Sequence, residues 1–231
     1  VLNGALETGP VYSAIAIQAD PMQRADILDR QGRTIATMLP TVNMIADATA
    51  VIDAEAAANA LMTVFPELNK TDVQRRLSSN KKFVYLRRHL SPTKQMQANA
   101  LGIPGVKFEN AHKRVYPFGR LFAHTLGTTD PDNNGKAGIE LALNKRLSQE
   151  KEPLVLSLDA GVQSSVRNIL NESLARFNAA GAAAVVMDAN TAELIALVSL
   201  PDYDPKNIGK ANAEAQFNRA TLGVYEMGST F

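Results

Sequence analysis

The fold is decided by the stretch "AAAVVMDANTAELIALVSL", which runs from Ala182 to Leu200. Two apolar runs flank a short polar turn, and both are apolar enough on both faces to form central antiparallel strands. A long amphipathic helix precedes them, with Asp159 as its N-cap, one apolar face that needs a sheet to lie on, and Gly181 at its end. A short apolar strand, "LVLSLD", comes before the helix. This half of the chain therefore predicts helices packed on an antiparallel sheet.

The first half alternates short strands with capped helices. "RADILDRQGRTIA", residues 24–36, predicts a hairpin in which glycine supplies the turn. The capping signals predict three helices: one from Asp53 to about Phe65, one opened by the capping box of Thr71 and Gln74, and one opened by Ser91-Pro92 and closed by Gly102. "KKFVYLRRHL" between them predicts a strand with basic ends.

Composition excludes several classes of protein. The 231 residues suffice for one large or two small domains, and 45% of them are apolar, enough for a sizeable core. A formal net charge of +1 makes nucleic acid a poor partner. With no cysteine there is no disulfide framework and no thiolate chemistry. Neither a signal peptide nor an apolar run of about 18 residues is recognisable.

Three patterns that resemble ligand sites are better explained by ordinary structure. The basic strand ends carry Lys81, Lys82, Arg87 and Arg88 but no glycine-rich loop, which favours a charged sheet edge over a phosphate site. "DPDNNGKAGIEL", residues 130–141, begins like a calcium loop, but Leu141 stands where a bidentate glutamate is needed, which favours a turn. The histidines, at 89, 112 and 124, lack metal-ligand spacing. We expect no metal and no cofactor.

Several long motifs, in a fixed order, resemble one family. They are "RADILDRQGRTIA", "FVYLRRHLS", "ALGIPGVKFENAHKRVYPFGRLFAHTLG", "GIELALN", "LVLSLDAGVQ", "AVVMDANTAELIALVSLPDYDP" and "FNRATLGVYEMGSTF". From Arg24 onward the chain is similar to the class B penicillin-binding proteins, the monofunctional peptidoglycan D,D-transpeptidases, and most closely to the septal cell-division member. It departs from the family at Met227, usually proline, at Ala25, usually glycine, and at Ala192, in a turn that usually reads Thr-Gly.

The resemblance implies an α+β chain in two parts. Residues 1–147 resemble the elongated N-terminal pedestal, or dimerisation, domain, and residues 148–231 resemble the incomplete start of a penicillin-binding transpeptidase domain of the serine β-lactamase-like kind. The connection around residues 147–153 is shorter than the family's usual one, through either a deletion or residues left out of the sequence.

The same resemblance implies the chemistry. In the family's Ser-x-x-Lys motif Ser229 would be the nucleophile, and its lysine would directly follow Phe231. A serine hydroxyl needs an adjacent base, and a lysine one helical turn on can act as that base. The serine would attack the stem peptide's D-Ala-D-Ala, and β-lactams would trap it covalently. Neither the family's Ser-x-Asn motif nor its Lys-Thr-Gly strand lies downstream of Ser229 in the sequence given, so the fragment alone is expected to be inactive.

Three hypotheses follow. The first is a septal transpeptidase on the periplasmic face of the bacterial inner membrane, held by a single-pass anchor upstream of Val1, with peptidoglycan stem peptides, a SEDS-family glycosyltransferase and division-complex proteins as partners. The second is a non-catalytic pedestal that binds division proteins. Its candidate contacts are Arg24, Asp29, Arg30 and Glu140, for which solvated charges are the favoured alternative. The third, a β-lactam sensor or carboxypeptidase, is disfavoured because such proteins normally lack the pedestal.

Overall fold

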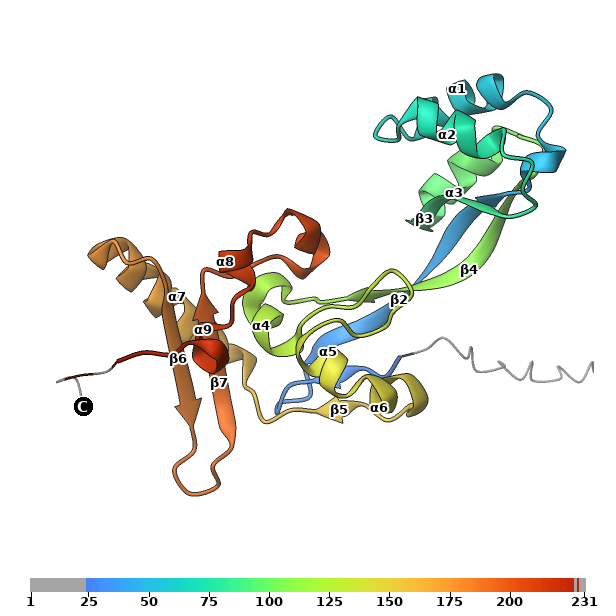
Figure 1. The fold of residues 1–231 in the computed structure, drawn as a ribbon. Coiled ribbons are helices and arrows are strands. Elements are labelled where there is room, and N and C mark those ends of the chain that lie inside the picture. Colours follow the sequence, from blue (N-terminus) through green and yellow to red (C-terminus); the bar gives the residue numbers. More distant parts are fainter. Residues whose placement is uncertain (1–23, 227, 229–231) are drawn as a thin grey trace, which may run out of the picture.

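The computed structural model describes residues 24–226 and 228. These residues form an elongated molecule in which a distal helical lobe, a central part and a terminal part follow one another (Figure 1). Helices and antiparallel strands occur in all three parts, which confirms the α+β prediction with an elongated first domain. No helix within this described part of the chain is long and apolar enough to cross a bilayer.

Two long strands connect the distal lobe to the central part. β2 (Thr34–Ala46) pairs antiparallel with β4 (Val106–Val115) along its length, from Thr37 opposite Val115 to Ala46 opposite Val106. β3 (Val84–Leu90) pairs with the far half of β2 on its other edge. The two-stranded stem visible in Figure 1 therefore becomes a three-stranded sheet only inside the distal lobe.

The distal lobe has a core of its own under three helices. The helices are α1 (Ala54–Val64), α2 (Lys70–Leu77) and α3 (Pro92–Asn99), and a 3-10 turn, η1 (Ala48–Ala50), precedes them. Asp53 and Ser91 cap α1 and α3 as predicted. The predicted capping box of Thr71 and Gln74 is wrong, because Asn69 caps α2 through a bond to the Asp72 amide at 3.0 Å. Buried side chains from all three helices and the sheet, including Leu61, Phe65 and Met44, fill the core.

The central part is built around the predicted hairpin. β1 (Ile27–Leu28) turns back into β2, with Gly32 at a φ of +77°, and β5 (Leu154–Val155) adds to β1 in parallel. Around this sheet lie η2 (Gly119–Phe122), α4 (Ala123–Leu126), α5 (Gly138–Ala142) and α6 (Asn144–Gln149). Ile27, Ile35, Phe122 and Leu147 are among the buried residues of its core.

The terminal part contains the long helix and the hairpin predicted from the sequence. α7 (Ala160–Phe177) is followed by β6 (Ala182–Met187) and β7 (Leu194–Leu200), which pair antiparallel. The chain continues through η3 (Pro205–Lys210), α8 (Ala213–Gln216) and α9 (Arg219–Leu222). α7 ends before the predicted Gly181, because Asn178 adopts the left-handed conformation at a φ of +47° and stops the helix.

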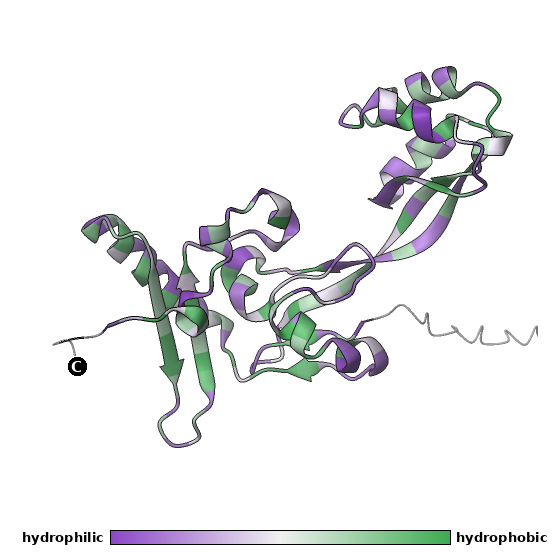
Figure 2. Cartoon of the chain, in the orientation of Figure 1, coloured by the Kyte–Doolittle hydropathy of each residue, from purple (hydrophilic) through white to green (hydrophobic). Residues whose placement is uncertain are grey.

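Apolar side chains of the terminal part remain on the surface of the described residues. Figure 2 shows the apolar colouring along β6 and α7. Ile169 and Phe177 of α7 and Val185 and Met187 of β6 are exposed. The amphipathic helix was expected to lie on a sheet with its apolar face. α7 does contact both β6 and β7, but only Ala160 and Gln163, in its first turns, are fully buried.

The turn between β6 and β7 yields a stability prediction. Ala192 has a φ of +59°, a conformation that costs an L-residue about 1–2 kcal/mol and glycine little. Glycine loses more backbone entropy on folding, so Ala192→Gly should stabilise the protein by a net amount of up to about 1 kcal/mol. Ala189→Gly in the same turn is the matched control, because Ala189 has no positive φ, and it should not stabilise. Urea unfolding midpoints would measure both, and equal midpoints for the two variants would contradict the prediction.

Candidate functional site

A buried ionic cluster holds the base of the central part together. The Glu140 carboxylate of α5 accepts hydrogen bonds from Arg24 Nε at 2.6 Å and from Arg114 Nε of β4 at 2.7 Å. The side chains of Arg24, Arg114 and Glu140 are only 3%, 1% and 0% exposed. Two cations therefore share one carboxylate out of contact with solvent, and the cluster depends on Glu140.

Neutral acceptors complete the cluster. Arg24 also donates to the Asn144 side chain at 2.8 Å and to the Glu140 carbonyl at 2.6 Å, and Arg114 donates to the Ala25 carbonyl at 2.8 Å. Burial, and then the neighbouring Glu140 charge, raise the pKa of Tyr116, which stays a neutral phenol. Solvation was the favoured expectation for Arg24 and Glu140, and it is wrong, because both are buried by packing between segments far apart in the sequence.

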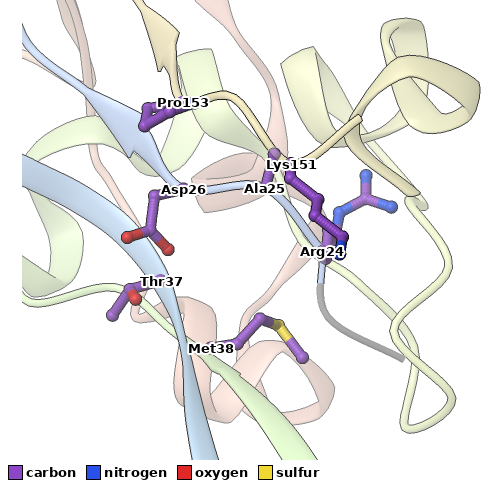
Figure 3. Close-up of a pocket in the computed structure, with 7 residues that line it drawn as sticks. All are labelled: Arg24, Ala25, Asp26, Thr37, Met38, Lys151 and Pro153. Carbon is purple, nitrogen blue, oxygen red and sulfur yellow. The ribbon is translucent and has the colours of Figure 1, made fainter. Parts of the chain in front are cut away.

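A small polar pocket of about 190 Å³ lies beside this cluster (Figure 3). Arg24 contributes to its wall, but its guanidinium is already bonded to Glu140 and Asn144. The Asp26 carboxylate points toward Thr37, and the Lys151 side chain extends toward Arg24. The pocket therefore offers one carboxylate and one ammonium group at its wall, and Arg24 belongs to the structural cluster rather than to the pocket.

A second group of charges joins the hairpin turn to the start of α7. The Asp29 carboxylate is fully buried and accepts from four donors: the amides of Gln31, Arg33 and Ala160 and the Nε of Arg33. Arg33 also reaches Asp159, the N-cap of α7, at 3.2 Å. Solvation was the favoured expectation for Asp29 too, and it is wrong, because the turn is closed over by α7.

The pKa of Asp29 is set by opposing effects. Burial alone would raise it, but hydrogen bonds from the Arg33 side chain and from the backbone amides of Arg33, Ala160 and Gln31 outweigh burial and lower it below its ordinary value of 3.8. A carboxylate with a lowered pKa in the folded state stabilises the fold above its unfolded pKa. The contribution is lost as the pH falls through the folded-state pKa.

Asp29→Asn should therefore weaken this junction. The asparagine side chain has one oxygen acceptor, and its NH₂ group would face N–H donors that the second carboxylate oxygen now accepts from. We therefore expect the free energy of unfolding to fall by about 1.5–3 kcal/mol at neutral pH. The loss should shrink below about pH 4, where the carboxylate of the unfolded wild-type chain takes up a proton before that of the folded protein does. Urea unfolding from pH 3 to pH 7 would measure this, with Asp26→Asn, a partly exposed carboxylate of the same hairpin, as control. A loss that is independent of pH would contradict the assignment.

Gln163 forms hydrogen bonds between uncharged groups near the same junction. Its side chain is buried in the first turns of α7, where its amide nitrogen donates to the carbonyls of Leu121 in η2 at 2.9 Å and of Leu197 in β7 at 2.7 Å. Its oxygen accepts from the Leu197 amide at 2.9 Å. One side chain therefore links the central part to the terminal hairpin.

The remaining candidate contact, Arg30, has a different environment. Its side chain is 38% exposed and lies 3.6 Å from Glu193, in the turn between β6 and β7. Of the four candidate contacts, Arg30 alone presents a largely accessible charge. A partner-binding role for any of the four stays a prediction.

Ser229, the predicted nucleophile, lies outside the described residues, as does Met227. The chain that leads to it is described as far as Glu226. Asn218 caps α9 by accepting from the Ala220 amide at 3.1 Å, and the Arg219 amide donates to the Ser199 hydroxyl of β7 at 2.9 Å. The start of α9, which precedes Ser229 in the sequence, is therefore hydrogen-bonded to β7 of the hairpin.

The patterns set aside as ligand sites are structural. Asp130 closes its turn by accepting from the amides of Asp132 and Asn134, as expected for a turn. Arg88 pairs with Asp132 at 2.6 Å. No group of three or more potential metal ligands occurs within residues 24–226.

Some residues that build these sites were not predicted from the sequence. Arg33, Arg114 and Asn144 were not singled out, although each lies in or beside a motif that carried the family resemblance. Their partners are distant in the sequence, so only the order of the motifs signalled their importance. Gln163 was likewise hidden at the end of "LVLSLDAGVQ".

The chain belongs to the family of the penicillin-binding protein dimerisation domain, whose model matches residues 19–169. The penicillin-binding protein transpeptidase domain matches residues 182–231. Together they confirm the predicted resemblance to class B penicillin-binding proteins. The predicted boundary near residue 147 stays a prediction; residues 154 and 158, beyond it, pack into the central core.

Three curated relatives show the likeness more closely. The chain is 33% identical over 212 residues to "Probable peptidoglycan D,D-transpeptidase FtsI" of Caulobacter vibrioides, covering 90% of this chain and 36% of the relative. It is 30% identical over 248 residues to "Probable peptidoglycan D,D-transpeptidase PenA" of Neisseria gonorrhoeae, covering 93% and 42%. It is 30% identical over 253 residues to "Peptidoglycan D,D-transpeptidase FtsI" of Escherichia coli, covering 94% and 42%. The chain thus spans about two fifths of the length of these relatives.

Proposed function

We propose that this chain is the pedestal and the first part of the transpeptidase domain of a serine-type peptidoglycan D,D-transpeptidase. The observation that carries the proposal is the match of residues 182–231 to the transpeptidase domain, continuous with a pedestal that matches its own family model. The relatives named as D,D-transpeptidases support the reaction class. The pedestal would end near residue 147 and the transpeptidase domain would begin at residue 148.

In this proposal Ser229 is the nucleophile of a Ser-x-x-Lys motif. The neutral lysine takes the hydroxyl proton as the serine oxygen attacks the penultimate D-Ala carbonyl of a stem peptide. The peptide bond to the terminal D-Ala breaks, and D-Ala leaves with a proton on its amine. An amine of a second stem peptide then displaces the serine from the ester, which forms the cross-link and returns the proton to the serine.

The cellular setting is proposed from the relatives named FtsI. The protein would act at the division septum, on the periplasmic face of the inner membrane, through an anchor upstream of residue 1. A SEDS-family glycosyltransferase and division-complex proteins would be its partners, and β-lactams its covalent inhibitors. Three of the four residues on which a non-catalytic binding module was based are buried, so no observation favours that alternative.

The proposal is tested on the full-length natural protein. It is incubated with a fluorescent penicillin, and its mass is taken under denaturing conditions. We expect one covalent adduct per chain, which forms with saturation kinetics and is prevented by prior treatment with an unlabelled β-lactam. A folded full-length protein that gains no adduct would mean that the transpeptidase assignment is wrong.

A further inference from the structure

The segment that joins β7 to α9 packs against α4 and η2 of the central part. We call residues 201–217 the strap. It contains η3 and α8, and Figure 1 shows α8 beside α4. The strap leads directly into α9 and then toward Ser229, so whatever holds the strap also constrains the chain that carries the predicted nucleophile.

Tyr203 and His124 fasten the strap to α4. The Tyr203 ring is buried, and its hydroxyl donates to the Ala123 carbonyl at 2.9 Å. The His124 ring packs edge-on against it, with centroids 5.3 Å apart, and His124 Nε2 lies 2.8 Å from the Ala215 carbonyl. Because a carbonyl only accepts, Nε2 carries the proton. Burial lowers the pKa of His124, so the ring is a neutral donor at neutral pH.

A charged group fastens the start of the strap. The Asp202 carboxylate is 7% exposed, pairs with Arg167 of α7 at 2.6 Å and lies 3.5 Å from Arg120 of η2. Arg120 belongs to the central part and Arg167 to the terminal part. The first residues of the strap are thus bonded to both.

The other end of the strap is bonded to α9. The Ser199 hydroxyl donates to the Phe217 carbonyl at 3.4 Å and accepts from the Arg219 amide at 2.9 Å. The Arg219 guanidinium reaches back to Glu214 of α8, through the carbonyl at 3.1 Å and the carboxylate at 2.9 Å. Strap, α9 and the edge of β7 therefore form one hydrogen-bonded unit.

We propose that His124 and Tyr203 are positioning residues, through which the pedestal sets the placement of the chain approaching Ser229. Each contact removed on α4 would loosen the strap and, through Glu214 and Ser199, the α9 segment. The consequence for acylation rests on the proposed function, whereas the mechanical coupling does not. This gives the pedestal a part in the chemistry besides that of a spacer.

Three variants separate the hydrogen bonds from the packing. Tyr203→Phe removes only the hydroxyl bond to Ala123, and His124→Phe keeps a ring against Tyr203 but loses the donor to Ala215. His124→Gln restores a donor at the place of Nε2. Tyr85→Phe in β3 of the distal lobe is the matched control, because it removes a tyrosine hydroxyl far from the strap.

The first measurement is hydrogen exchange of the backbone amides of residues 218–226 in the full-length protein. Loss of one buried hydrogen bond should speed exchange about five- to tenfold in Tyr203→Phe and His124→Phe. His124→Gln and Tyr85→Phe should exchange like the wild type. If residues 218–226 exchanged at the wild-type rate in both Tyr203→Phe and His124→Phe, the proposal would be overturned, whatever the protein's activity.

The second measurement is acylation by the fluorescent penicillin at a series of concentrations. Mispositioning should lower the first-order acylation rate about tenfold in Tyr203→Phe and His124→Phe, with little change in the half-saturating penicillin concentration. His124→Gln should have the acylation rate of the wild type. Wild-type labelling with equal rates in all variants would overturn the positioning role and leave the proposed function standing. Absence of labelling in the wild type would count against the proposed function, and the exchange data would still decide on the coupling.

Discussion

Replacing Ser229 by alanine should abolish the penicillin adduct and the transpeptidase reaction of the full-length protein. In the proposed reaction an ester forms on the Ser229 oxygen, and alanine has no atom that can form it. Loss of a catalytic nucleophile lowers turnover by a factor on the order of 10⁶, so the residual rate should be undetectable. Labelling in gel fluorescence and release of D-Ala from a stem-peptide substrate would measure the two losses.

The matched control for this change is Ser173→Ala. Ser173 lies on α7, and its hydroxyl is bonded to the Ile169 carbonyl of its own helix at 2.9 Å. Its replacement should leave the rate of labelling and the unfolding midpoint close to those of the wild type. A Ser229→Ala variant that still forms the adduct would show that another residue is the nucleophile.

Replacing Glu140 by glutamine should destabilise the protein by about 3–5 kcal/mol, the cost of breaking a buried ion pair from one side. The substitution leaves Arg24 and Arg114 buried side by side without an anion, because both depend on the same carboxylate. Arg114→Met should cost less, since Arg24 and Glu140 would remain as a paired cation and anion. The free energy of unfolding in urea would measure both variants.

Glu150→Gln serves as the control for Glu140→Gln. Glu150 pairs with Arg146 one helical turn away at 2.9 Å, and both side chains are about half exposed. Such an exposed pair contributes at most about 0.5 kcal/mol. If Glu140→Gln lowered the free energy of unfolding as little as this control does, the cluster would not be what holds the central part together.

The sequence predicts local features of this fold well, because each depends on neighbouring residues. Asp53, Ser91 and Asp159 cap the helices that they were expected to cap, since each presents a side-chain acceptor just before a helical run. The predictions failed at the start of α2 and at the end of α7, where an asparagine precedes the residue that was expected to cap the helix. Asn69 is the N-cap of α2, and Asn178 is the left-handed C-cap of α7.

The sites could be predicted less well, because they depend on contacts between distant residues. Arg24 and Glu140 are 116 positions apart, and the Asp29 carboxylate bonds an amide 131 positions away. Read alone, charges in a hairpin or a turn favour solvation, and only the tertiary fold shows that these are buried. The strap contacts of His124 and Tyr203, 91 and 80 positions from their partners, could not be read from the sequence for the same reason.

The assignment of Ser229 as the nucleophile is tested by locating the penicillin adduct in the sequence. The full-length protein is labelled, digested with a protease, and the labelled peptide is sequenced by mass spectrometry. We expect one labelled peptide, with the adduct on Ser229 within Gly228-Ser229-Thr230-Phe231. An adduct on any other residue, or none on a folded protein, would contradict this assignment.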